Sequence, residues 1–175
     1  MNGVYISKKI LIAFGVIVAA LLFILLQIIE NSGTSISRPT IVTDASRFFT
    51  VSGCVNKYIT YLQSESTEEL LTILTPQYVE DNSITEQNIY TFLDQLPTIN
   101  NYTFSAREMY EIDLGDDIYR YEIYGWITED SFNSMNTNKR DTYYSVTLNE
   151  QTLTFSINPS TSEIFEEVKN EQATN

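Results

Sequence analysis

The sequence predicts an α+β protein, with an N-terminal transmembrane helix and then three helices packed on a curved, four-stranded antiparallel sheet. Three observations support this fold class. An apolar run fills residues 10–29, apolar residues recur at helical spacing across residues 44–96, and they alternate with polar ones from residue 102 onward. A run of helices followed by a run of strands is typical of α+β domains.

The apolar run, ILIAFGVIVAALLFILLQII, contains a single polar side chain, Gln27. A helix crosses the roughly 30 Å hydrocarbon core of a bilayer in about 20 residues, so the run predicts a single-pass transmembrane helix at residues 10–29. A cleaved signal peptide is the alternative, because the small residues Gly33, Thr34 and Ser35 follow the run. Apolar cores of signal peptides normally have about 7 to 15 residues, which favours an uncleaved anchor, although cleavage stays open.

The charges beside this run indicate its orientation. Lys8 and Lys9 directly precede it, and the first charge after it is Glu30. Lys and Arg near the ends of a first span are kept on the cytoplasmic side. We therefore expect residues 1–9 to form a cytoplasmic tail in a protein of the cell membrane, with an extracytoplasmic C-terminal domain.

Composition divides the rest of the chain into three parts. Residues 30–42 are small and polar and contain Pro39, which is typical of a linker. Residues 43–167 are long enough to form one domain with a single core. Residues 168–175 are largely polar and are expected to be a flexible tail.

Three amphipathic helices are expected to open the domain. Each has a start signal before a stretch of apolar residues at helical spacing, and a proline is expected to end the second and the third. The start signals are Asp44, Ser66 with Glu69, and Ser83 with Glu86, and the prolines are Pro76 and Pro97.

The second half of the domain predicts four strands that form an antiparallel meander. In residues 102–114 the even-numbered side chains are mostly apolar, which predicts one long strand with a single face toward the core. Gly115, Asp116 and Asp117 supply the chemistry of a tight turn. The further strands are expected at residues 118–127, 144–148 and 153–157, with a polar loop at residues 128–141.

Charge and missing residue types exclude several classes of function. The chain has a net charge of −13, which repels phosphate backbones and makes nucleic acid an unsuitable partner. It has one cysteine, Cys54, and no histidine, so it lacks an intrachain disulfide, a cysteine-built metal site and the common histidine-based nucleophile arrangements. We expect no metal, no cofactor and no enzymatic activity.

The order of these elements resembles the membrane-anchored NTF2-like domains, including the VirB8-like and TcpC-like components of bacterial conjugation and secretion machines. This resemblance implies a cone whose mouth, between the helices and the concave sheet, is able to hold a ligand, and enzymes of that fold place an Asp and Tyr pair there. The segment from Phe48 to Leu62, followed by Leu70 to Tyr78, is also similar to the opening of small uncharacterised anchored proteins of low-GC Gram-positive bacteria, a similarity that brings no function with it.

Such a cone suggests one candidate pocket in this chain. Its lining would be Glu108, Tyr110, Tyr119, Tyr121 and Tyr144, which lie on strand faces predicted to point inward. A buried carboxyl beside tyrosine hydroxyls has a raised pKa and acts as a general base. In the alternative interpretation the aromatic residues only pair across strands, and Glu108 marks a β-bulge or a change of exposed face.

A second candidate site is an aromatic patch made of Tyr124 and Trp126. These two residues are expected on the sheet face opposite to Tyr121. If that face is exposed, they form a patch of the kind that anchors protein partners, and otherwise they belong to a second layer of core.

The sequence therefore favours a non-catalytic, membrane-anchored interaction module that binds other envelope proteins, as an assembly or secretion scaffold component. The alternative is a ligand-binding or enzymatic cone with tyrosine and glutamate side chains in its mouth.

Overall fold

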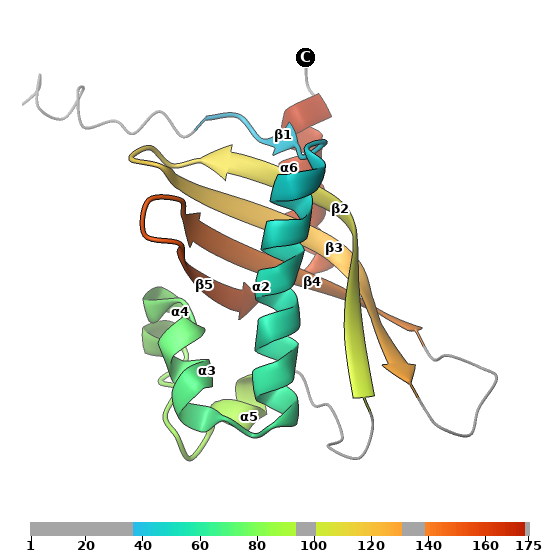
Figure 1. Ribbon diagram of the computed structural model, residues 1–175. Coiled ribbons are helices and arrows are strands. Elements are labelled where there is room, and N and C mark those ends of the chain that lie inside the picture. Colours follow the sequence, from blue (N-terminus) through green and yellow to red (C-terminus); the bar gives the residue numbers. More distant parts are fainter. Residues whose placement is uncertain (1–36, 94–100, 131–138, 174–175) are drawn as a thin grey trace, which may run out of the picture. The chain divides into compact units, whose positions relative to one another are not determined.

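The structure is a computed structural model, and it describes residues 37–93, 101–130 and 139–173 (Figure 1). The predicted transmembrane helix at residues 10–29 lies outside these ranges. Within them, no helix is both long and apolar enough to cross a bilayer.

The described residues form an α+β domain built on one antiparallel sheet, and the strands lie in it in the order in which they follow one another along the chain. The prediction of four strands was wrong, because the sheet has five. The additional strand, β1, lies in the expected linker and places Thr40 opposite Glu111. A strand of two residues has no periodicity that a sequence pattern reveals. The strands are β1 (Thr40–Ile41), β2 (Asn101–Asp113), β3 (Ile118–Asp130), β4 (Lys139–Asn149) and β5 (Thr154–Pro159).

The prediction of three helices was also wrong, because the described residues contain five. The first follows Asp44 as expected, with the Asp44 carboxylate accepting a hydrogen bond of 2.7 Å from the backbone N–H of Arg47. The second helix ends at Ile73, before Pro76, as expected. Pro76 itself begins a further short helix, since a first-turn position needs no N–H donor. The helices are α2 (Ala45–Gln63), α3 (Thr67–Ile73), α4 (Pro76–Asp81), α5 (Ile89–Phe92) and α6 (Ser162–Ala173).

Helix α6 occupies residues that the sequence assigned in part to a flexible tail. It buries only two apolar side chains, Phe165 and Val168, while glutamates cover much of its exposed surface. Two apolar residues are too few to identify an amphipathic helix by periodicity. The tail prediction therefore does not hold for residues 168–173.

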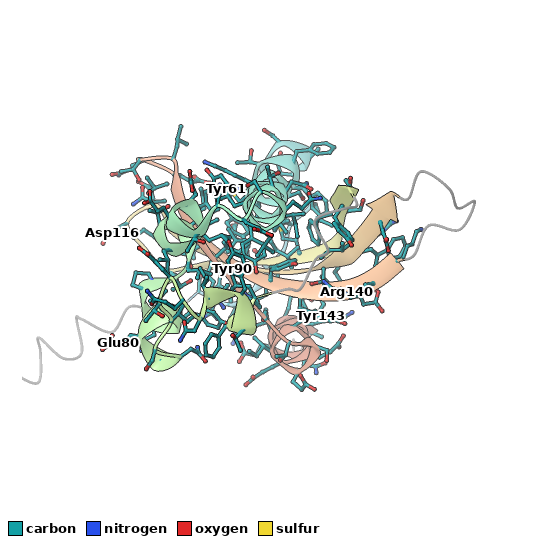
Figure 2. All side chains as sticks on the ribbon, turned by 90° about the horizontal axis from the view of Figure 1, so that it is seen from below. Tyr61, Glu80, Tyr90, Asp116, Arg140 and Tyr143 are labelled. Carbon is teal, nitrogen blue, oxygen red and sulfur yellow. The ribbon has the colours of Figure 1, made fainter. Side chains whose placement is uncertain are left out.

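Two cores lie on opposite faces of the sheet, with α2 against one face and α6 against the other (Figures 1 and 2). In the main core, the ring of Tyr144 makes edge-to-face contacts with Tyr58 at 5.5 Å and with Phe104 at 5.6 Å between centroids. The second core is smaller and centres on Phe165, whose ring makes an edge-to-face contact with Tyr110 at 5.5 Å between centroids. The predicted cone, with helices on one face only, was therefore wrong.

A β-bulge in β2 determines which side chains face each core. Ala106 lies opposite Gly125 and Glu108 lies opposite the next residue, Tyr124, so Arg107 is the extra residue. Before the bulge, even-numbered residues such as Phe104 belong to the main core, whereas after it the even-numbered residues belong to the second core. As a result, Arg107 and Glu108 follow one another on the α6 face.

Candidate functional site

The five residues of the predicted pocket are divided between the two faces of the sheet. Tyr121 and Tyr144 are fully buried in the main core, and Tyr119 packs at its edge. Glu108 and Tyr110 lie beyond the bulge on the α6 face. Because the sheet separates the two groups, they do not line one pocket.

Glu108 is held as a carboxylate that fastens α6 to the sheet. It accepts a hydrogen bond of 2.6 Å from the Tyr110 hydroxyl and one of 3.1 Å from the Lys169 ammonium. Burial raises the pKa of Glu108, but these two hydrogen bonds outweigh it and leave the pKa below its usual value. The general base expected at this position requires a raised pKa, so the geometry instead suits a structural role.

A buried carboxyl that the sequence did not reveal lies at the base of α6. Glu122 on β3 is only 3% exposed, and it accepts hydrogen bonds of 2.9 Å from Ser145 Oγ and 3.2 Å from Ser160 Oγ. Burial raises the pKa of Glu122, although both hydrogen bonds and the nearby charge of Arg120 act in the opposite direction. The one sign in the sequence that Glu122 is buried was its place on the same strand face as Tyr124.

Replacing Glu122 with glutamine is expected to remove a loss of stability at rising pH. In acid, Glu122 is protonated in both the folded and the unfolded state. Because its folded-state pKa lies above the unfolded value, ionising this buried group as the pH rises costs the folded state free energy. From about pH 4.5 upward, the free energy of unfolding of the wild type should fall relative to the variant, by at most about 1.4 kcal/mol per pH unit. Urea unfolding of both full-length proteins in a non-ionic detergent measures this. A free energy of unfolding of the wild type that stays constant or rises with pH relative to that of the variant would contradict it.

A shallow depression of about 350 Å³ lies beside the first turn of α2 and includes Arg47, Thr50 and Glu150. Arg47 forms ion pairs of 2.6 Å with Glu111 and 2.7 Å with Glu150, and its guanidinium lies 4.9 Å from the ring centroid of Tyr119. The positive charge of Arg47 is therefore already matched by two carboxylates. These contacts tie α2 to β2 and to the β4–β5 hairpin.

The two residues of the predicted aromatic patch have different environments. Tyr124 belongs to the second core, where its ring stacks on Tyr143 at 5.2 Å between centroids. Trp126 is half-buried and lies two residues further along β3, with its indole N–H donating a hydrogen bond of 3.2 Å to the Tyr124 hydroxyl. That hydroxyl in turn donates to the Asp141 carboxylate at 3.0 Å. The ring of Trp126 is thus held in place by its neighbours.

Two cations lie against the Trp126 ring. The Arg107 guanidinium carbon is 3.5 Å from the ring centroid, and the Lys139 ammonium nitrogen is 4.3 Å from it. They come from β2 and β4, the strands on either side of β3. Arg107 reaches the indole because it is the extra residue of the bulge.

The register places hydroxyl-bearing residues around this cluster. Ser105 lies opposite Trp126, and Thr128 lies opposite both Thr103 and Lys139. Opposed residues of an antiparallel pair share a face, so all of them lie on the α6 side of the sheet. Thr103, Ser105, Arg107 and Lys139 are exposed there. Asp141 of β4 also lies opposite Trp126 and is exposed. We call this surface the Trp126 face, and its members are Thr103, Ser105, Arg107, Trp126, Thr128, Lys139 and Asp141.

The two cations of the Trp126 face outnumber its one carboxylate, Asp141, which accepts a hydrogen bond from Tyr124. Arg47, Arg120 and Lys169 each pair with a carboxylate, whereas Arg107 and Lys139 have no carboxylate partner in the described part of the chain. The chain contains 23 acidic and 10 basic residues, so carboxylates are abundant. With Asp141 counted, the Trp126 face carries two positive charges and one negative charge around an aromatic ring.

Comparison with known proteins found no matching family, no similar curated protein and no similar solved structure. The class of fold is therefore described from its elements alone: the described part of the chain is an α+β domain with a five-stranded antiparallel meander between α2 and α6.

Proposed function

We propose that this protein is a membrane-anchored, non-catalytic interaction module, and that its domain binds other envelope proteins outside the cytoplasm through the Trp126 face. One observation carries this proposal: a half-buried tryptophan lies between two exposed cations that form no ion pair with a described carboxylate. Tryptophan and arginine are the residues most enriched among those that dominate binding energy in protein interfaces.

The rigidity of this face supports the proposal. The Trp126 ring is fixed by a hydrogen bond to Tyr124, and Tyr124 is itself packed against α6 through Phe165. A partner would therefore order few side chains on this surface, which reduces the entropy lost on binding.

The apolar run at residues 10–29 and the preceding Lys8 and Lys9 support the membrane anchor and its orientation. An anchored domain shares the membrane with its partners, which raises their effective concentration. Proteins of the same envelope are therefore the partners that we propose.

Photocrosslinking in intact cells tests this proposal. A photoreactive amino acid is placed at Ser105, in the Trp126 face, and at the exposed Thr60 of α2 as the control on the other side of the sheet. We expect a specific protein adduct from position 105 and none of the same mass from position 60. The adduct should fall about tenfold when Arg107 is replaced by glutamate, since a charge-assisted contact becomes a repulsion.

Two results would overturn the proposal. One is the absence of any protein adduct from position 105 in cells that accumulate the variant at the wild-type level. The other is an adduct from position 105 that is unaffected by both Arg107→Glu and Lys139→Glu.

A further inference from the structure

We propose that the Trp126 face recognises an acidic peptide segment of a different protein, with carboxylates of that segment paired to Arg107 and Lys139. This inference rests on the proposed function and specifies the chemistry of its partner.

The two cations are arranged for carboxylate binding before any partner arrives. Contact with the indole ring limits the rotamers of the Arg107 and Lys139 side chains, so these side chains lose less conformational entropy when they bind a carboxylate. A guanidinium that stacks by its planar face still presents its N–H donors at its edge. Arg107 is therefore able to contact Trp126 and a carboxylate at the same time.

The surroundings of the cations favour a peptide over a dense polyanion. A net charge of −13 repels nucleic acid and anionic lipid surfaces. At physiological ionic strength charges are screened beyond about 8 Å, so a carboxylate close to Arg107 and Lys139 interacts mainly with those two cations and with Asp141, whose single negative charge they outnumber. A peptide carries few charges per unit length, and it also supplies backbone groups that hydrogen-bond with the hydroxyls of Thr103, Ser105 and Thr128.

A second copy of this chain is a less suitable partner. Helix α6 does expose acidic side chains, including Glu163, Glu166 and Glu167. However, two copies that each carry a net charge of −13 repel one another. Self-association is therefore an outcome of the test that would overturn the proposal.

The chain contains one tryptophan, so its fluorescence reports on this face alone. The experiment uses the full-length protein in a non-ionic detergent. The probe is a synthetic glutamate-rich peptide without tryptophan, and the matched peptide has glutamine at each glutamate position. We expect a saturable change in emission with the glutamate peptide and binding at least about tenfold weaker with the glutamine peptide.

Charge-removing variants locate the binding site. Arg107→Gln and Lys139→Gln are each expected to weaken binding of the glutamate peptide by about five- to tenfold. The matched control is Lys57→Gln, because Lys57 also lies over aromatic rings, 5.6 Å from the centroids of Tyr61 and Phe155, but on α2. This control should leave the affinity unchanged.

Four results would overturn the inference: equal affinity for the two peptides, an equal response to inorganic phosphate at the same charge concentration, equal weakening by Lys57→Gln, or an emission change on concentrating the protein alone. The first three do not affect the crosslink expected from Ser105, and self-association would give an adduct of twice the mass of the chain, so failure of this inference is distinguishable from failure of the proposed function.

Discussion

Replacing Gly125 with alanine is expected to lower the free energy of unfolding by about 3 kcal/mol. An added Cβ atom would lie 2.5 Å from Cε2 of the Phe104 ring and 2.6 Å from the backbone oxygen of Ser105. The ring has little room to move, because Phe104 is buried and makes an edge-to-face contact with Tyr144. The backbone oxygen is fixed by the pairing of β2 with β3.

Gly53 provides the matched control for this prediction. It lies on the exposed side of α2, and an added Cβ atom there meets nothing within 4 Å. Alanine has a higher helix propensity than glycine, so Gly53→Ala is expected to stabilise the protein by about 1 kcal/mol. Chemical unfolding followed by circular dichroism measures both changes. Shifts of the same sign in the two variants would show that the contact with Phe104 is not what requires glycine at position 125.

Deleting Ser105 is expected to abolish folding, whereas deleting Arg107, two residues later, is expected to preserve it. Arg107 is the extra residue of the bulge, so its removal leaves every other residue of β2 on its present face. Removal of Ser105, in contrast, moves a side chain of β2 to the wrong face whether the bulge is kept or lost. If the bulge is kept, Phe104 turns away from the main core, and if the bulge is lost, Arg107 takes the core position opposite Gly125.

The two deletions shorten the same strand by one residue, and each serves as the control for the other. We expect the Arg107 deletion to cost about 1–2 kcal/mol through loss of its contact with Trp126. After the Ser105 deletion, loss of Phe104 from the main core costs about 3–5 kcal/mol, and burial of an unpaired cation costs more, against a total stability of about 5–15 kcal/mol for a typical domain. Circular dichroism and limited proteolysis of the two purified proteins distinguish these outcomes. Equal protease resistance would mean that the bulge does not set the faces of β2.

The predicted pocket shows how a single residue changes the meaning of a sequence pattern. The even-numbered side chains from Tyr102 to Leu114 are apolar except for Glu108, a pattern typical of one regular strand. The two deviations were Glu108 among the apolar positions and Met109 among the polar ones, and both follow the bulge. The alternative interpretation of Glu108 as the mark of a bulge is the one that the structure confirms.

The candidate interaction surface was predictable only in part. The alternation of β3 placed Tyr124 and Trp126 on one face, which the structure also does. No pattern in the sequence indicated that α6 covers Tyr124 and leaves Trp126 half-exposed. Arg107 and Lys139 are 32 positions apart in the sequence, and no pattern indicated that both lie against the same indole ring.

The sequence by itself determined the elements that depend on local periodicity and local hydrogen bonding: the start of α2 at Asp44, the presence of β2 to β5 and the turn at Gly115, where φ is +84°. The predicted loop at residues 128–141 was wrong at both ends, because β3 continues to Asp130 and β4 begins at Lys139. Only the tertiary structure decided the features that depend on what packs against what. These are the pairing of β1 with β2, the docking of α6 on Phe165, and the bulge at Arg107. Each of them involves too few residues to produce a period, and each is stabilised by contacts between segments that are distant in the chain.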